Sequence, residues 1–194
     1  QMCIRDRNRE DRKPLILLGA RQVGKTYILK EFGQREFENV AYINCDNNAM
    51  AKDLFASDYN IDRILLTIGA ITGVNIEAGK TLIIMDEIQE LHRGLASLKY
   101  FCENAREYHV AVAGSLLGLS LHQGESYPVG KVNTLEMYPM TFEEFLWARG
   151  FKQRMDLLQH GMWDVVKSLR TLYIQHLREY YLVGGMPEAV NKFI

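Results

Sequence analysis

The sequence predicts an α/β fold, a doubly wound parallel sheet of about five strands with helices on both of its faces. Short apolar runs, typical of strands buried on both sides, alternate with segments of helical periodicity. The first of these runs, residues 15–18, leads into a glycine-containing turn and then a helical pattern. Two later runs end directly in polar side chains, and the carboxyl ends of parallel strands are where such sheets hold ligands.

Residues 19–26 (Gly-Ala-Arg-Gln-Val-Gly-Lys-Thr) fit the phosphate-loop pattern GxxxxGK(S/T) at every fixed position. Glycines at 19 and 24 permit the backbone angles that wrap the chain around phosphates. Lys25 would place its charge at the β- and γ-phosphates, and the hydroxyl of Thr26 is a hard oxygen ligand for Mg²⁺. The alternative, a chance glycine turn before a helix, is disfavoured by the flanking strand and helix patterns. The predicted nucleotide contacts are Gly19, Ala20, Arg21, Gln22, Val23, Gly24, Lys25, Thr26 and Tyr27.

Two carboxylates come directly after the run of four apolar residues 82–85, which follows Thr81. If that run is a buried parallel strand, Asp86 and Glu87 lie at its carboxyl end. Asp86 would bind Mg²⁺, directly or through water, and Glu87 would accept a proton from a water that attacks the γ-phosphate. The alternative is an acidic first turn of a helix. The phosphate-loop pattern upstream favours the catalytic interpretation.

Ser115 comes directly after a further apolar run at residues 110–114. In phosphate-loop folds with an additional strand, this strand lies between the loop strand and the acidic strand, which gives the order 5-1-4-3-2. Ser115 would then face the γ-phosphate as a sensor that hydrogen-bonds the phosphate or the attacking water. It could equally be the N-cap of a following helix, and one serine can do both.

The remaining elements complete the predicted organisation. Further strands are expected at 39–44 and 132–138, a loop at 123–131, and helices at 27–32 (ended by Gly33), 49–56, 61–71, 91–107, 142–147 (capped by Thr141), 162–182 and from 188 on. We expect a phosphate-loop core at 13–139 and a helical lid region at 140–194. The first seven residues differ in character from the rest of the chain, so segment 1–12 is assigned to neither region and its origin is doubtful.

Composition sets limits on the protein class. Hydrophobic residues are 47%, charged residues 24% and the net charge is −1, which gives no global argument for nucleic acid or an anionic membrane. Cys3, Cys45 and Cys102 are far apart, and the five histidines show no metal spacing. We expect reduced thiols, a cytoplasmic location and no membrane span.

Five motifs in this order, GARQVGKT, LIIMDEIQ, VAVAGSLLG, YPMTFEEFL and VGGMPEAV, resemble a family of prokaryotic AAA-type ATPases. In that family the ATPase domain precedes a C-terminal domain similar to the restriction-endonuclease fold. The resemblance extends from about Lys13 to the last residue, and it implies ATP and Mg²⁺ as ligands. It implies phosphate and metal binding by Gly24, Lys25 and Thr26, with Asp86 as metal-site acid, Glu87 as base and Ser115 as sensor. It also implies that the chain is a fragment without the C-terminal domain.

The sequence leaves several functions open. The first is an ATPase; the alternative is a nucleotide-dependent switch that recognises a protein or DNA partner and hydrolyses slowly. AAA-type sites often need an arginine from a neighbouring subunit, which a homo-oligomer could supply; the sequence assigns no arginine to that role, and Arg106 and Arg149 are the two candidates. A kinase is less favoured because an Asp-Glu pair suits activation of water, and a GTPase because no NKxD-type segment occurs.

Overall fold

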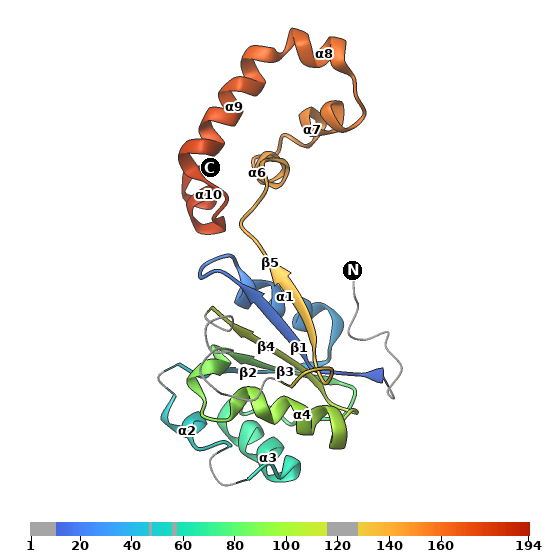
Figure 1. Ribbon diagram of the computed structural model, residues 1–194, viewed down its shortest axis with the longest axis vertical. Helices are drawn as coiled ribbons and strands as arrows, with labels where there is room; N and C mark the ends of the chain where they lie inside the picture. The colour runs from blue at the N-terminus through green and yellow to red at the C-terminus, as the bar shows by residue number, and fades with distance from the viewer. Residues whose placement is uncertain (1–10, 47, 56–57, 116–127) are drawn as a thin grey trace. The chain divides into compact units, whose positions relative to one another are not determined.

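The computed structural model describes residues 11–46, 48–55, 58–115 and 128–194 (Figure 1). The chain divides into two compact units, which we call the sheet unit (residues 1–137) and the helical unit (residues 138–194). Most of the doubtful segment 1–12, and residues 123–127 of the predicted loop, lie outside the described residues.

The sheet unit contains a five-stranded parallel sheet. Its strands are β1 (Leu15–Gly19), β2 (Asn39–Asn44), β3 (Thr81–Asp86), β4 (His109–Gly114) and β5 (Asn133–Met137). The spatial order is β2-β3-β4-β1-β5, and every neighbouring pair is parallel. The predicted order 5-1-4-3-2 is therefore confirmed, as is the α/β class. Strands β3 and β4 are buried along their whole length, because neighbouring strands and helices enclose them.

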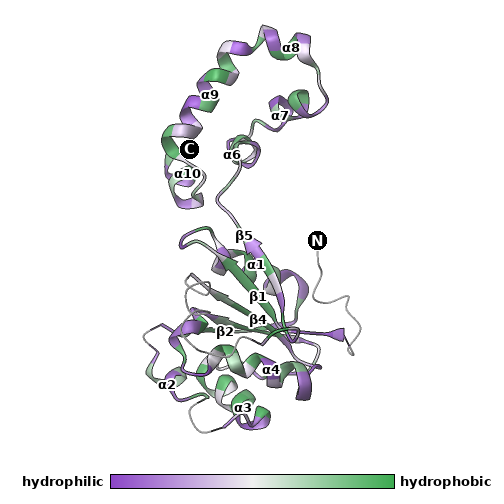
Figure 2. Cartoon of the chain, viewed as in Figure 1, coloured by the Kyte–Doolittle hydropathy of each residue, from purple (hydrophilic) through white to green (hydrophobic). Residues whose placement is uncertain are grey.

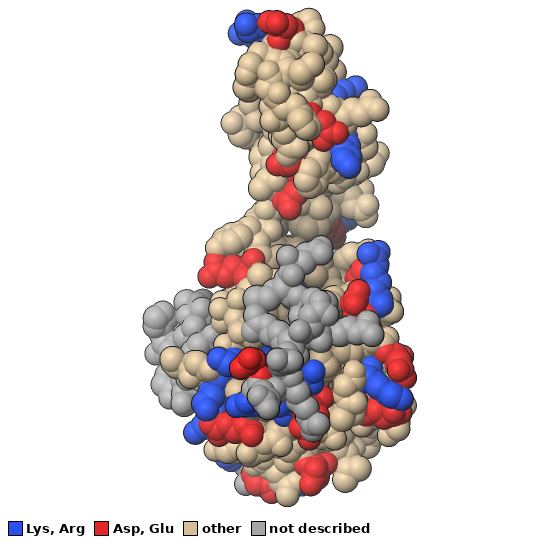
Figure 3. All heavy atoms as spheres, turned by 90° about the vertical axis from the view of Figure 1, so that its right-hand side faces the viewer, with Lys and Arg blue, Asp and Glu red and all other residues tan. Residues whose placement is uncertain are grey.

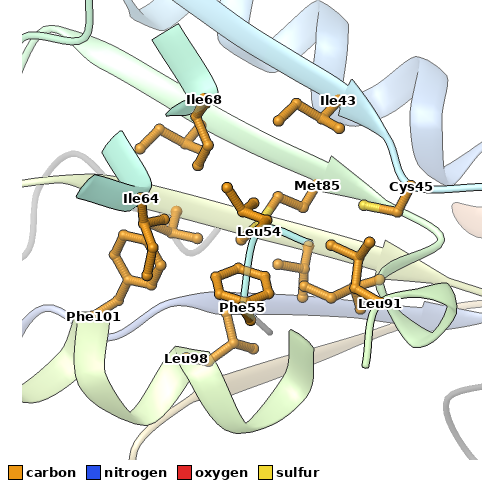
Figure 4. Packing of buried hydrophobic residues seen from close by; sticks show 14 of the residues in the cluster. Ile43, Cys45, Leu54, Phe55, Ile64, Ile68, Met85, Leu91, Leu98 and Phe101 are labelled. Atoms are coloured by element: carbon orange, nitrogen blue, oxygen red, sulfur yellow. The ribbon is translucent and has the colours of Figure 1, made fainter. Parts of the chain in front are cut away.

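Helices cover both faces of this sheet (Figure 1). Helix α1 (Lys25–Glu36) packs on one face, and α2 (Ala49–Lys52), α3 (Ile61–Thr72) and α4 (Gly94–Asn104) pack on the other. Alternate residues of one strand serve the two faces: Ile83 belongs to the larger cluster and Ile84 to the smaller one. Figure 4 shows the larger cluster, in which Phe55, Leu98 and Phe101 point toward the strands. Cys45 and Cys102 are free thiols, as predicted, and both are buried.

Three helix boundaries of the sheet unit differ from the prediction. Gly33 does not end α1 but lies buried within it, where an added Cβ would be 2.7 Å from Cγ2 of Val40. Its small size permits close approach of the helix to β2. The predicted helix at 49–56 ends at Lys52, residue 56 lying outside the described part. The helix predicted at 91–107 is shorter: it begins at Gly94, after Arg93 with its φ of 63°, and ends at Asn104, and the 3₁₀ helix η3 (Ile88–Glu90) precedes it.

The helical unit consists of short helices around a small core. They are α6 (Phe142–Ala148), α7 (Lys152–Gln159), α8 (Trp163–Ser168), α9 (Arg170–Val183) and α10 (Pro187–Phe193). The capping box is present: Thr141 Oγ1 accepts from Glu144 N at 3.2 Å, and Thr141 N donates to Glu144 Oε2 at 2.8 Å. The single helix predicted at 162–182 is wrong, since the chain breaks at Leu169, and α7 was not predicted. Figure 2 shows that α7, α8 and α9 mix polar and apolar residues. Neither α7 nor α8 contains a buried residue.

The segment Gly184-Gly185-Met186-Pro187 separates α9 from α10. Gly184 has φ 76°, and Pro187 occupies the first turn of α10. Gly185 packs against the backbone of Met140: an added Cβ would lie 2.1 Å from Met140 O, and Met140 N donates to Gly185 O at 2.7 Å. Two of the sequence motifs therefore meet backbone to backbone. Gly185 therefore packs against another segment of the helical unit in addition to lying between two helices.

Charge and hydropathy agree with the composition. On the face drawn in Figure 3, described basic and acidic side chains are mixed and form no area of one sign. Lys80, for example, pairs with both Glu38 and Glu77. Among the helices of the described ranges, none combines the length and apolar character needed to cross a bilayer.

Candidate active site

Three neighbouring strands end at one edge of the sheet. Residues 20–24 follow β1, Asp86 is the last residue of β3, and Ser115 follows β4. The register pairs Asp86 with Ala113 and Leu18 with Gly114, so the three ends are level with one another. This edge is where open α/β sheets place ligands.

The loop after β1 depends on close backbone packing. An added Cβ on Gly19 would lie 2.3 Å from the carbonyl oxygen of Met137 in β5, which leaves no room for a side chain. Gly24 has φ 93° and forms the N-cap of α1. The free amide groups at the start of α1 therefore face the loop. Gln22 also has positive φ (67°), and Val23 is fully buried beneath the loop. Ala20, Arg21, Gln22 and Tyr27 are exposed.

Lys25 lies beneath this loop and is 6% exposed. Its Nζ donates to the carbonyl oxygens of Gly19 at 2.9 Å and Ala20 at 2.7 Å. Burial lowers the pKa of Lys25 from 10.5, against the smaller opposing effect of the negative charges of Glu87 and Asp86. The structure therefore brings the loop lysine into electrostatic contact with both acids.

Asp86 joins the loop to the acidic strand. Thr26 Oγ1 donates to Asp86 Oδ2 at 2.5 Å, and Tyr42 of β2 donates its hydroxyl to the same oxygen at 3.2 Å. The other carboxylate oxygen accepts from Glu87 N at 3.1 Å. Burial, followed by the neighbouring Asp86, raises the pKa of Tyr42 to about 12, so its hydroxyl remains a donor.

The residues present suit Mg²⁺ carried by a nucleotide. Thr26 and Asp86 offer two adjacent hard oxygens from different segments. In the described ranges, no group of three or more histidine, cysteine or acidic side chains could hold a metal by itself. Mg²⁺ is characteristically bound by one or two protein oxygens together with phosphates and water, so this donor set fits the ion.

Glu87 is held by three donors. Its Oε2 accepts from Gln89 Nε2 at 2.6 Å, from Ser115 Oγ at 3.1 Å and from Ser115 N at 3.2 Å. Burial, the largest single effect, raises the pKa of Glu87. The hydrogen bonds of Gln89 and Ser115 and the charge of Lys25 together outweigh it, and the net pKa is lowered. Glu87 also has φ 52°, which is uncommon for a residue with a side chain.

Ser115 therefore lies against the predicted base. Its alternative as an N-cap concerns residues from 116 on, outside the described part.

Of the two arginines considered, Arg106 precedes β4 and so lies near the opposite edge of the sheet, where its Nε donates to Cys102 O. Arg149 belongs to the helical unit, where it pairs with Glu179.

The sequence did not single out Gln89 or Tyr42. Gln89 stands two residues after Glu87, in the motif LIIMDEIQ, and only the turn of η3 brings its amide back to that carboxylate. Tyr42 lies on β2, the strand next to β3, and its side chain reaches Asp86 from a position paired with Ile84. The alternation of residues along β2 could have indicated the face of the sheet on which Tyr42 lies, but not that its hydroxyl bonds Asp86.

Comparisons with known proteins give a family and several proteins that the chain resembles. The model of a family described as "AAA domain" matches residues 11–146. An uncharacterised protein of Methanocaldococcus jannaschii is 28% identical over 198 residues, which cover 93% of this chain and 40% of that protein. The chain thus spans about two fifths of the length of this relative.

Two solved structures are similar in fold. The Walker-type ATPase of Pyrococcus abyssi is 17% identical to this chain, and the TM-score is 0.46. The match covers 92% of this chain and 76% of the chain of that ATPase. The RuvB Holliday junction branch migration motor of Thermotoga maritima is 19% identical to this chain, and the TM-score is 0.47. The match covers 76% of this chain and 44% of the RuvB chain.

Proposed function

The chain belongs to the AAA domain family, and from that premise we propose that it binds ATP together with Mg²⁺ and hydrolyses the terminal phosphate. One observation carries the proposal. The 2.5 Å hydrogen bond from Thr26 to Asp86 joins the loop to the acidic strand, 60 residues away in the sequence. A loop lysine, a metal-binding pair and a carboxylate base then surround one site.

Binding would use the loop backbone and Lys25. The amide groups at the start of α1 favour an anion, and the glycines at 19 and 24 permit close approach. Lys25 would exchange the carbonyl oxygens of Gly19 and Ala20 for oxygens of the β- and γ-phosphates. Both of its present acceptors are backbone carbonyl oxygens of the loop that would bind the phosphates.

Thr26 and Asp86 would hold Mg²⁺. The ion, when bound, neutralises negative charge on the β- and γ-phosphates. Glu87 would accept a proton from water as the water oxygen forms its bond to the γ-phosphorus. The bond from that phosphorus to the bridging oxygen breaks, and ADP leaves with the bond electrons. Ser115 would donate a hydrogen bond at the γ-phosphate or the water.

A nucleotide-dependent switch with little hydrolysis is the second candidate. The observation that favours it is that Oε2 of Glu87 already accepts three hydrogen bonds, which stabilise the charged carboxylate and make it less ready to take a proton. Turnover measured against protein concentration separates the two. A steep rise supports an ATPase completed by assembly, with an arginine from a neighbouring subunit; a flat, near-zero rate supports the switch.

Two substitutions test the ATPase proposal. Glu87→Gln should retain Mg-ATP binding and lose at least about 100-fold in turnover, since general-base catalysis contributes 10²–10⁴-fold. Lys25→Ala should abolish binding, measured with a fluorescent ATP analogue. Unchanged phosphate release by Glu87→Gln would remove the base assignment, and undiminished affinity of Lys25→Ala would refute the loop assignment.

Other expectations belong to the same proposal. A homo-oligomer, a protein or DNA partner and a cytoplasmic location stay predictions. The family match ends at residue 146 and does not bear on the C-terminal restriction-endonuclease-like domain, which also stays a prediction.

A further inference from the structure

Gln89 lies in a rigid turn directly after the predicted base. It is the central residue of η3, whose turn is closed by hydrogen bonds from Glu90 N to Glu87 O and from Leu91 N to Ile88 O, both 3.0 Å. Ile88 is fully buried and anchors this turn to the core. The backbone of Gln89 is therefore fixed relative to Glu87.

The amide of Gln89 is directed at one oxygen of Glu87. The Nε2–Oε2 distance of 2.6 Å is the shortest of the three contacts to that oxygen. The other two come from Ser115, which follows β4, so donors from two separate elements meet there. Among the described residues, no hydrogen bond is found to the second oxygen of Glu87, Oε1.

The other end of the same amide argues against a purely structural role. In the described part of the chain, Oε1 of Gln89 is buried and has no hydrogen-bond partner. Buried polar atoms are usually paired, and an unpaired one lowers stability. The only hydrogen bond found for this side chain among the described residues is thus the one to Glu87, and it is kept at a cost to stability.

We propose that Gln89 is a positioning residue for hydrolysis, which, together with Ser115, fixes Oε2 of Glu87 and leaves Oε1 as the oxygen that takes the proton of the attacking water. This inference rests on the proposed ATPase function. Holding one carboxylate oxygen from two sides restricts rotation of the group about its last side-chain bond. A base aligned in this way loses little orientational freedom as the proton is transferred.

Gln89→Met tests the proposal, because methionine keeps the length of the side chain and removes both amide ends. We expect kcat to fall about ten- to hundred-fold through misalignment of Glu87. The KM and the dissociation constant for Mg-ATP should stay within about two-fold, since the hydrogen bond found for the Gln89 side chain among the described residues goes to Glu87 and not to a residue assigned to phosphate or metal binding. The urea midpoint should not fall, because the unpaired Oε1 is removed with the donor.

Gln34→Met is the matched control. It makes the same chemical change at an exposed position of α1 and should leave kcat, KM and stability unchanged. Unchanged kcat in Gln89→Met would overturn the inference. A parallel loss of affinity, urea midpoint and kcat would also overturn it, because that result assigns Gln89 a structural role.

The wild-type chain is assayed in parallel and separates the two levels of the argument. If the wild type and Gln89→Met hydrolyse ATP with the same kcat, only the proposed role of Gln89 is rejected. Tight Mg-ATP binding by the wild type without turnover rejects the proposed hydrolysis, and the role of Gln89 with it.

Discussion

The sheet unit and the helical unit are stabilised in different ways. The sheet unit contains two extensive clusters of buried apolar side chains, one on each face of the sheet. In the described residues of the helical unit, the buried apolar side chains are Phe145, Leu146, Tyr173 and Val190. Strand pairing fixes where each residue of the sheet unit lies, whereas the short helices of the other unit depend on few contacts each.

Ion pairs and hydrogen bonds add to the stability that the small apolar core gives the helical unit. Arg149 pairs with Glu179, and its guanidinium lies 5.1 Å from the ring centre of Phe151. His176 is 3% exposed; its Nδ1 donates to Glu179 at 3.0 Å, and its Nε2 accepts from Arg154 at 2.6 Å. Such a network is sensitive to loss of any member, since the other members are left unpaired at low exposure. The difference between the units can be tested by disturbing each kind of contact.

The largest expected effect is the loss of an aromatic ring from each unit. Phe101→Ala should destabilise the sheet unit by about 4 kcal/mol, because Phe101 is 1% exposed and packs inside the larger cluster. Phe151→Ala should destabilise the helical unit by about 1–2 kcal/mol, because Phe151 is only partly buried. Hydrogen exchange of β3 and β4 amides measures the first effect.

Tryptophan fluorescence during urea unfolding measures the second effect, because Trp147 and Trp163, the only two tryptophans, both lie in the helical unit. Equal destabilisation by the two substitutions would contradict the proposed difference in packing.

Sequence reasoning was most successful where burial is continuous. The apolar run at 82–85 lies in β3, which is buried at every position, because a strand enclosed on both faces needs an apolar sequence. The site edge followed from this, since parallel strands bring their carboxyl ends together. What could not be predicted were contacts that depend on side-chain direction, such as Tyr42 with Asp86 and Gln89 with Glu87.

The helical unit was predicted less completely for a related physical reason. Thr141 was identified as a cap because its partner Glu144 is three residues away. Helix α7 and the break at Leu169 carry no comparable local signal, and their residues are mostly half-exposed. The ion pair of Arg149 with Glu179 joins residues 30 positions apart, which no periodicity indicates.

Gly185 offers an intermediate effect within the helical unit. Gly185→Ala should destabilise that unit by about 3 kcal/mol, because the added Cβ meets the backbone of Met140, which cannot move aside as a flexible side chain would. Gly150→Ala is the control: Gly150 has φ 77° but open space around it, so only backbone strain of about 1 kcal/mol is expected. Fluorescence-monitored urea unfolding compares the two. A Gly185→Ala protein as stable as Gly150→Ala would show that the close contact of Gly185 with Met140 adds nothing to stability.

The smallest expected effect is electrostatic and depends on pH. The hydrogen bond from His176, then that from Arg149, holds the pKa of Glu179 at about 2, below its ordinary 4.5. A carboxyl whose folded pKa is depressed stabilises the fold fully above its unfolded pKa, near 4.5, and that contribution is lost as pH falls toward 2. We expect the free energy of unfolding to fall by about 1 kcal/mol over this window, less than the full shift implies, because Glu179 is partly exposed to solvent.

Glu179→Gln should remove this pH dependence from the stability measured by fluorescence. Glu188→Gln should retain it, because the Glu188–Lys192 pair is solvent-exposed and screened by salt. Identical pH profiles for wild type and Glu179→Gln would show that the charged network adds nothing to the helical unit, and its few buried apolar side chains would then have to stabilise it alone.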